Sequence, residues 1–400
     1  MAKNIKAQVR PELLVWARTT AGYAQADASA RLKIDEDTYV AWEAGLELPS
    51  FPQLRKVAEL FKRPLAVFFL SEPPSGFEVM RDLRRLPGSG FRYLPPGLQQ
   101  EIRQAAQRRE LAIELAEDIG IDLFPFDLSA NLTEDPEIVG DRVRRFLGIS
   151  TKQQFAWKDA EGRASFSGWR NKIEHAGVLI FQATKFSSED ASGFAIWKPI
   201  LPTIVINRKD VLTRRTFSLL HEFVHLMLRV SSVSDLETDA ARPAEDQALE
   251  IFCNQVAASA LMPMFDLMED DRLRGHGAKS IDWSDAEISD LARSYGVSRE
   301  AFVRRLLTFD LTTPEFYQRK RNQYNAEYVV YLERQKQKQK ESDGIPRNMP
   351  LETISNFGRP FVGMVLGNYH QERLTLSEVS GYLGLKTKHL PKLEQIAGFR

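Results

Sequence analysis

Two histidines and a glutamate lie close together in one apolar segment of the chain, at His221, Glu222 and His225. The residues on either side are largely apolar and predict a helix. A helix places residues four apart on one face, so both imidazoles can bind one metal ion while Glu222 lies beside a metal-bound water. The H-E-x-x-H pattern therefore predicts a zinc hydrolase in which Zn²⁺ is the cofactor and Glu222 is catalytic.

Chance is a poor explanation for this spacing. With 6 histidines in 400 residues, an accidental H-E-x-x-H should arise in on the order of one such chain in a hundred. An apolar helix would also bury these polar groups, at a cost of roughly 1–3 kcal/mol each if they lacked a partner. A bound metal would supply that partner.

A catalytic zinc site needs a third protein ligand and keeps its fourth position open for water. The acidic candidates downstream are Glu237, Asp239, Glu245, Asp246 and Glu250. Glu250 lies in a helical segment, 247–263, that is rich in small residues and suited to packing against the histidine helix. We therefore expect Glu250 to be the ligand, with Asp246 in reserve. Asn254, one turn further on, is placed to hydrogen-bond the free nitrogen of a ligating histidine.

These motifs resemble a known family. The segments His221-Glu222-x-x-His225, Glu250-x-x-Cys253-Asn254 and Ala257-Ala258-x-Ala260-Leu261-Met262-Pro263 are together similar to the ImmA/IrrE family of bacterial metallopeptidases, over residues 120–310. The resemblance implies that His221, His225 and Glu250 bind zinc and that Glu222 is the base. It also implies a DNA-bound repressor as the substrate, cut at one site.

Cys253 departs from the family, which often has alanine there, and phenylalanine where this chain has Val256. A cysteine three residues after a ligand could bind the metal as a thiolate. Among alanine and phenylalanine on a helix, however, a lone cysteine is more often a small buried apolar residue. We favour packing for Cys253.

Composition restricts the class of protein. Hydrophobic residues make up 43% of the chain, the formal net charge is +0, and there is 1 cysteine. The length allows two or three cores, and no overall charge draws the chain toward nucleic acid. The start of the chain leads into no apolar signal segment, and no apolar run reaches membrane-spanning length. We expect a soluble cytoplasmic protein without a membrane partner.

The first 70 residues predict a bundle of short helices. Pro11 begins the first, 24–32 forms the second, Asp35 caps a third that ends before Gly45, and 51–61 forms the fourth. Residues 8–70 resemble the XRE (Cro/C1-type) helix-turn-helix family. That resemblance implies operator DNA as a possible partner and this bundle as a possible site of oligomerisation.

The charges of the expected recognition helix oppose DNA binding. Residues 24–47 contain two basic and six acidic residues, a net charge of minus four, and the helix would begin with Asp35, Glu36 and Asp37. Carboxylates are repelled by a phosphate backbone. The alternative is a module kept for protein contacts or dimerisation. If the bundle does bind DNA, the candidate contacts are Arg31, Lys33, Thr38 and Tyr39.

The fold class we expect is α+β and mostly helical. Residues 71–122 should be a linker and a helix with Arg103, Arg108 and Arg109 on a solvated face. The peptidase domain, 123–310, should contain a small zincin-like sheet with strands near 177–182, 193–197 and 203–207. By fold-level analogy, 193–197 would be an edge strand that pairs with an extended substrate.

The rest of the chain predicts a basic helix or linker over 311–345 and a helical module over 346–400. The module has a helix-turn-helix rhythm. Its cations Lys386, Lys388, His389 and Lys392 could contact nucleic acid, while packing or partner docking explains the pattern equally well.

Two classes of function remain open from sequence. One is a regulatory zinc endopeptidase that cleaves a bound repressor or other partner protein. The other is an antitoxin-like transcriptional regulator that sequesters a cognate toxin without cleaving it. The intact Glu222 favours the first, because a purely structural site would tolerate its loss. The acidic recognition helix favours the second.

Overall fold

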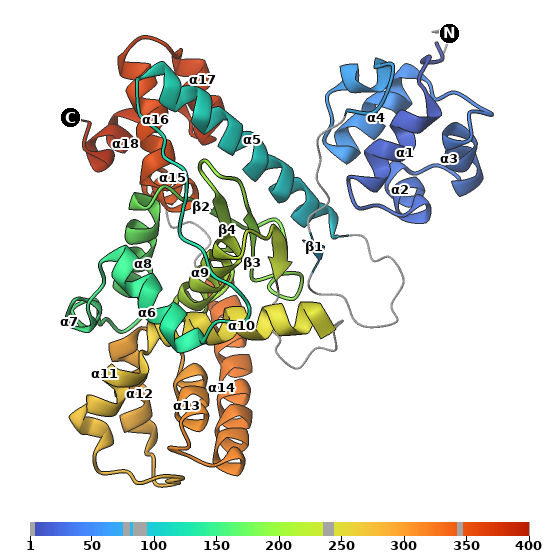
Figure 1. Ribbon diagram of the computed structural model, residues 1–400. Coiled ribbons are helices and arrows are strands. Elements are labelled where there is room, and N and C mark those ends of the chain that lie inside the picture. The colour runs from blue at the N-terminus through green and yellow to red at the C-terminus, as the bar shows by residue number, and fades with distance from the viewer. Residues whose placement is uncertain (1–4, 75–80, 83–93, 235–243, 342–346, 400) are drawn as a thin grey trace.

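The computed structural model describes residues 5–74, 81–82, 94–234, 244–341 and 347–399 (Figure 1). Most of these residues are helical, and one small mixed sheet lies in the middle of the chain. The expected α+β, mostly helical fold class is confirmed. Of the helices in these ranges, none combines the length and the apolar character that crossing a membrane requires.

The first helices form a small bundle with a core of its own. They are α1 (Pro11–Thr19), α2 (Gln25–Leu32), α3 (Glu36–Glu43), α4 (Phe51–Phe61) and the 3-10 turn η1 (Leu65–Phe69). Tyr39, Trp42 and Phe61 are buried at its centre. A short connection joins α2 to α3, with Lys33 in the left-handed region at φ 58°. The predicted helices are confirmed here, while the helix-turn-helix resemblance stays a prediction.

A buried ion pair ties three helices of this bundle together. Arg18 donates from Nε and Nη2 to the two carboxylate oxygens of Glu43, at 2.7 and 3.0 Å. Gln25 donates to the same carboxylate at 2.8 Å. The Arg18 and Glu43 side chains are 9% and 3% exposed. Glu43 is therefore a buried partner of Arg18 and Gln25 inside the bundle. It is not part of a surface that could repel DNA.

Replacing Glu43 with glutamine should destabilise the bundle by about 3 kcal/mol, because the buried Arg18 guanidinium would lose its counter-charge. Hydrogen exchange of the α1–α4 amides in the full chain measures this change. Glu36→Gln is the matched control, since Glu36 is exposed on the same helix and should change stability by no more than about 0.5 kcal/mol. Equal protection in the two variants would contradict the assignment.

The central sheet contains five strands. These are β1 (Arg81–Asp82), β2 (Leu179–Ala183), β3 (Gly193–Ile196), β4 (Thr203–Asn207) and β5 (Ser232–Ser234), in the order β1-β5-β3-β4-β2. β3 is antiparallel to both of its neighbours, and the outer pairs β2–β4 and β1–β5 are parallel. The three predicted strands are confirmed. The prediction that 193–197 is an edge strand is wrong, because both sides of β3 are already hydrogen-bonded.

Both faces of the sheet are covered, and strands β2, β3, β4 and β5 are buried throughout. Side chains alternate along a strand, and Ile180, Ala195 and Ile204 face one core while Phe181 and Phe194 face another. The first core includes the apolar residues of the helix that contains the histidine motif. Helices far from that motif in sequence cover the second.

Helices of the middle of the chain build the first core. They are α6 (Pro136–Leu147), α7 (Thr151–Phe155), α8 (Arg163–His175), α9 (Leu212–Met227), α10 (Ala244–Leu261), α11 (Met264–Glu269), η2 (Asp271–Leu273), α12 (Asp285–Tyr295), α13 (Arg299–Thr308) and α14 (Pro314–Glu341). α9 packs on β3 and β4, and α10 packs on α9 and α6. In Figure 1, α10 runs below the sheet and α11–α14 lie beyond it. The predicted basic helix is α14, and it packs against α13.

The second core joins the helix after the linker to the end of the chain. Its helices are α5 (Pro96–Asp118), α15 (Met349–Phe357), α16 (Arg359–His370), α17 (Leu376–Leu383), η3 (Thr387–His389) and α18 (Leu390–Ala397). Phe361 and Leu366 of α16 are fully buried. The Asn368 amide donates to the Leu115 carbonyl of α5 at 2.8 Å. The packing alternative for the C-terminal module is thus observed, while Lys386, Lys388 and Lys392 remain exposed.

The arginines of α5 do not form a solvated face, and that prediction is wrong. Arg109 donates to the Ile200 carbonyl from Nε and Nη2, at 3.0 and 2.5 Å. Arg103 donates to the Thr20 carbonyl of the N-terminal bundle at 2.6 Å. The Arg108 guanidinium lies 4.9 Å from the centre of the Phe357 ring. Each cation instead joins α5 to another part of the molecule.

Candidate metal centre

The histidine motif lies on α9, in the interior of the molecule. His221 and His225 are 0% exposed and Glu222 is 1% exposed. The apolar residues of α9 pack into the first core and fix this helix against β3 and β4. The four-residue spacing brings the two imidazoles together, with their Nε2 atoms 3.0 Å apart.

The neighbouring helix α10 supplies a carboxylate between the two imidazoles. Glu250 Oε2 lies 3.4 Å from His221 Nε2, and Oε1 lies 3.3 Å from His225 Nε2. One ligand atom from each of these residues lies within 4.8 Å of the others. The structure therefore brings together the three residues that the sequence predicted as metal ligands.

The donor atoms fit a divalent cation. Both oxygens of Glu250 are buried without a hydrogen-bond partner among the described residues. Such orphaned carboxylate oxygens are costly, and a cation shared with the two facing nitrogens would satisfy them. Two imidazoles and one carboxylate are also a donor set that catalytic zinc sites use.

The outer nitrogens of the two histidines meet two adjacent residues of α10. His221 Nδ1 lies 2.9 Å from Asn254 Oδ1, as the sequence predicted. His225 Nδ1 lies 3.7 Å from the Cys253 sulfur. Each contact leaves Nε2 as the nitrogen that faces the cluster, and so fixes the orientation of the ring.

Cys253 is buried, and it is not a member of the cluster. Burial, with the negative charges of Glu250 and Glu222, holds the pKa of its thiol well above the usual value. The residue is thus a neutral thiol, which agrees with the packing interpretation. Its contact with His225 was not foreseen.

The ionisable groups of the cluster shift one another's pKa values. Burial would raise the pKa of Glu250, but the attraction of the nearby His221 and His225 holds it well below its usual range. Burial works to lower the pKa of His221, and the nearby Glu250 raises it overall. For His225 burial prevails and the pKa is lowered. Glu250 is therefore an ionised carboxylate, which is the form that binds a cation.

Glu222 lies beside the cluster and against the sheet. Burial raises its pKa to about 8, and the charge of Glu250 adds to this, while the nearby His221 and the Ser234 hydroxyl oppose it. Its Oε2 atom has no hydrogen-bond partner among the described residues. Such a carboxyl group, with a pKa near neutrality, is suited to accepting and returning a proton.

Two residues next to Glu222 were missed from sequence. A side chain at Gly193 of β3 would lie 3.2 Å from Glu222 Cγ and 2.8 Å from the Val205 carbonyl oxygen. Ser234 of β5 lies opposite Gly193, and its hydroxyl is 3.1 Å from His225 Nε2. A glycine and a serine have no distinctive spacing from the motif, so only the strand pairing reveals them.

The other acidic candidates do not join the cluster. Asp246 is largely buried on α10 but is not one of the three clustered residues, and Glu245 is exposed. Glu237 and Asp239 lie outside the described residues.

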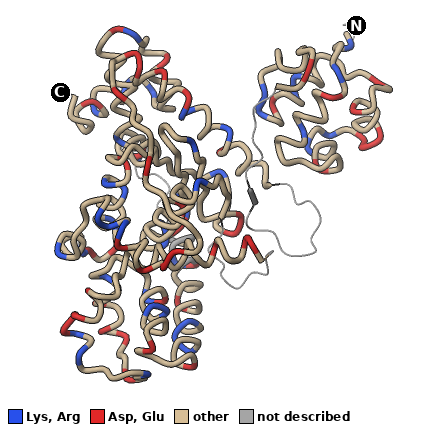
Figure 2. The backbone as a smooth tube through the Cα atoms, viewed as in Figure 1, with Lys and Arg blue, Asp and Glu red and all other residues tan. Residues whose placement is uncertain are grey.

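The DNA candidates lie on the N-terminal bundle, away from this centre (Figure 1). Arg31 and Lys33 are exposed and Thr38 is half-buried. Tyr39 is 0% exposed, in the core of the bundle, so the prediction that it contacts DNA is wrong. Acidic residues also gather at the start of α3, as Figure 2 shows.

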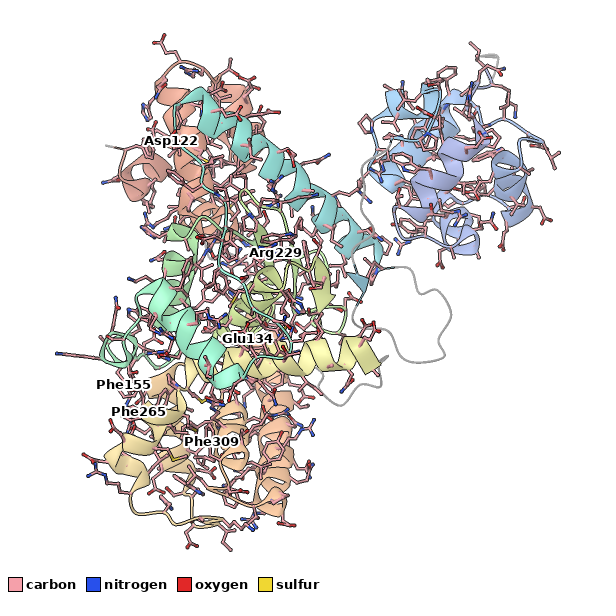
Figure 3. All side chains as sticks on the ribbon, viewed as in Figure 1. Asp122, Glu134, Phe155, Arg229, Phe265 and Phe309 are labelled. Carbon is pink, nitrogen blue, oxygen red and sulfur yellow. The ribbon has the colours of Figure 1, made fainter. Side chains whose placement is uncertain are left out.

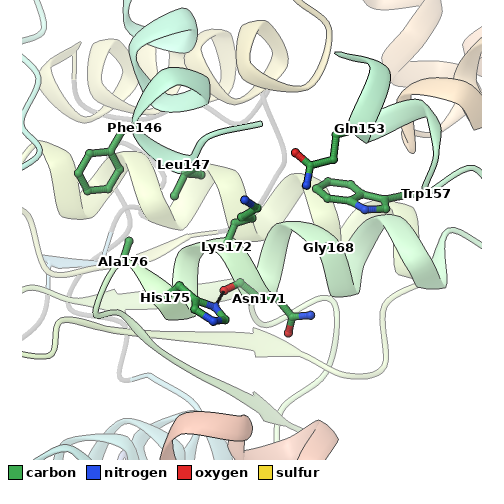
Figure 4. Close-up of a pocket in the computed structure, with 9 residues that line it drawn as sticks. All are labelled: Phe146, Leu147, Gln153, Trp157, Gly168, Asn171, Lys172, His175 and Ala176. Carbon is green, nitrogen blue, oxygen red and sulfur yellow. Dashed lines mark hydrogen bonds between the residues drawn. The ribbon is translucent and has the colours of Figure 1, made fainter. Parts of the chain in front are cut away.

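A separate cavity of about 520 Å³ lies on α6–α8 (Figure 4). Its lining residues are Phe146, Leu147, Gln153, Trp157, Gly168, Asn171, Lys172, His175 and Ala176. None of them belongs to the cluster.

Beyond the end of α9, Arg229 lies with its guanidinium 5.9 Å from the centre of the Trp197 ring, near the middle of the molecule in Figure 3. Neither feature provides a further ligand for the metal centre.

Part of the chain matches a family model. No curated protein matches the chain. Residues 173–307 match the family model of peptidase M78, the IrrE N-terminal-like domain. This range includes α9, β5 and α10, and therefore all three clustered residues together with Glu222. Residues 173–307 are thus similar to the metallopeptidase domain of the ImmA/IrrE type.

Proposed function

We propose that the protein is a regulatory zinc metalloendopeptidase that cleaves a partner protein such as a repressor. The observation that carries the proposal is the buried set of His221, His225 and Glu250, with Glu222 beside it, inside a domain similar to peptidase M78. A structural zinc site would need a fourth protein ligand. Among the described residues this cluster has three, with the buried Glu222 carboxyl group beside them.

His221, His225 and Glu250 would hold the zinc ion. When bound, zinc lowers the pKa of a water molecule to about 7 and polarises the peptide carbonyl. Glu222 then accepts the proton of the attacking water and delivers it to the departing amine. Asn254 and Cys253 keep the histidine rings oriented during these steps.

A comparison of wild type with Glu222→Gln tests the function. Tagged protein is recovered from the native host, and the co-purifying proteins are identified by mass spectrometry. Each is then incubated with purified zinc-loaded wild type. We expect a partner that is intact on the variant and is cut at one site by wild type, in a reaction that EDTA stops.

The second candidate is sequestration of a partner without cleavage. The exposed residues Asp35, Glu36 and Asp37 favour it, because they suit a basic protein better than DNA. In this case the partner would be a toxin or a regulator, and the protein would act as an antitoxin. A partner that stays intact with zinc-loaded wild type would support this candidate and contradict cleavage.

Asn254→Ala is expected to lower the affinity for Zn²⁺ by about 10- to 100-fold, because His221 would lose the group that orients its ring. Competition titration with a chromophoric chelator measures the affinity. Gln255→Ala is the control, since that exposed residue is next in the same helix. If both variants bind Zn²⁺ as wild type does, the role given to Asn254 is wrong.

A further inference from the structure

Ser234 is held in one position by the sheet. Its backbone carbonyl accepts a hydrogen bond from the Ser192 amide at 3.1 Å, and β5 pairs it with Gly193 of β3. Directly opposed residues of an antiparallel pair project from the same face of a sheet. The Gly193 position faces Glu222, so the Ser234 side chain faces the same carboxyl group.

The Ser234 hydroxyl lies between two groups of the centre. It is 3.1 Å from His225 Nε2. The Glu222 carboxyl group lies on the same face of the sheet, with Oε1 3.3 Å from the Cβ position of Gly193, the residue paired with Ser234. The residue is 0% exposed, so the hydroxyl is shielded from bulk solvent. A serine hydroxyl has one proton to donate, so it can donate a hydrogen bond to only one of these two acceptors at a time.

Metal binding determines which of the two groups accepts the hydrogen bond of the serine. An imidazole nitrogen bound to a cation has used its lone pair and cannot accept a proton from serine. Only the Glu222 carboxylate then remains as an acceptor. Since Glu222 Oε2 has no hydrogen-bond partner among the described residues, the serine would hold the other oxygen.

We propose that the Ser234 hydroxyl is a positioning residue for Glu222, holding one carboxylate oxygen so that Oε2 faces the reacting water. The inference rests on the proposed function and extends it with a residue outside the H-E-x-x-H helix. Gly193 completes the arrangement, because its lack of a side chain leaves room for the carboxyl group.

The chain offers a closely matched control in Ser232. It lies two residues earlier on β5, on the same face, and is also 0% exposed. Its hydroxyl has no hydrogen-bond partner among the described residues. Ser232→Ala therefore removes the same atoms from the same strand without removing a contact to Glu222.

The experiment uses the full chain with Ser234→Ala, Ser234→Thr and Ser232→Ala. Bound zinc and zinc affinity are measured first, and circular dichroism checks the fold. Titration calorimetry then measures the affinity of the zinc-loaded proteins for acetohydroxamate, a small metal-binding probe that also bonds to the general base. Where a cleaved partner is available, kcat and KM are determined separately.

We expect Ser234→Ala to keep its zinc affinity within about twofold and to bind acetohydroxamate about tenfold more weakly, the size of one lost hydrogen bond to a charged group. The value of kcat should fall while KM changes little. Ser234→Thr should restore most of the loss, and Ser232→Ala should match wild type.

Several outcomes would overturn the inference. Wild-type acetohydroxamate binding in zinc-loaded Ser234→Ala would show that the hydroxyl does not position Glu222. A large loss of zinc affinity in that variant would mean that the hydroxyl supports the metal instead. If wild type itself binds neither zinc nor acetohydroxamate, the proposed function fails, and this inference fails with it.

Discussion

Glutamine in place of Glu222 is expected to lower kcat for peptide cleavage by about 10²- to 10⁴-fold and to leave the zinc bound. Glutamine has nearly the same shape as glutamate but cannot accept a proton from water. Glu222 lies outside the set of three clustered ligands, so its charge is not required to hold the ion. Single-turnover cleavage of the captured partner and zinc content by mass spectrometry measure the two effects.

The control for this variant is Glu245→Gln, which changes an exposed carboxylate on α10. It should cleave the partner as fast as wild type. Retained cleavage by Glu222→Gln would exclude the residue as the base. Loss of zinc from that variant would show instead that Glu222 helps to bind the ion.

Glu250→Gln is expected to weaken zinc binding by at least about a hundredfold, because losing a ligand costs more than losing a group that only orients one. Zinc should then no longer stabilise the domain. For wild type, free zinc at a thousand times its dissociation constant should raise the free energy of unfolding by about 4 kcal/mol. Urea unfolding with and without EDTA measures this difference in both proteins.

Asp246→Asn is the matched control for the third ligand. Asp246 lies one turn earlier on α10 and is also largely buried, but it does not belong to the cluster. The variant should keep the response to zinc that Glu250→Gln loses. If zinc binding were lost only from Asp246→Asn, Asp246 would be the third ligand and Glu250 would not.

The three clustered residues of the candidate metal centre were predictable because their signals are local. His221 and His225 share a face through helical spacing alone, and Glu250 lies on a segment whose small residues favour close packing. Asn254 follows from Glu250 by one helical turn. In each case the periodicity of a single helix carries the information.

Features that depend on tertiary pairing were not predictable in the same way. The pattern of 193–197 marks a strand, but the position of β3 between β4 and β5 depends on contacts distant in sequence. The arginines of α5 resemble a solvated face until the Ile200 carbonyl and the N-terminal bundle are placed beside them. Ser234 reaches the candidate metal centre only because β5 pairs with β3.

The short strand β1 belongs to the segment between the N-terminal bundle and α5, and it pairs with β5 through Arg81 and Asp82. The segment that connects these two parts of the molecule therefore also supplies one of the two outer strands of the sheet. A protein shortened to begin at α5 would keep every ligand, yet it would leave the backbone of the Ser234 strand open to pairing with another chain. Truncation would thus remove the bundle and would also remove the strand that pairs with β5 next to the candidate metal centre.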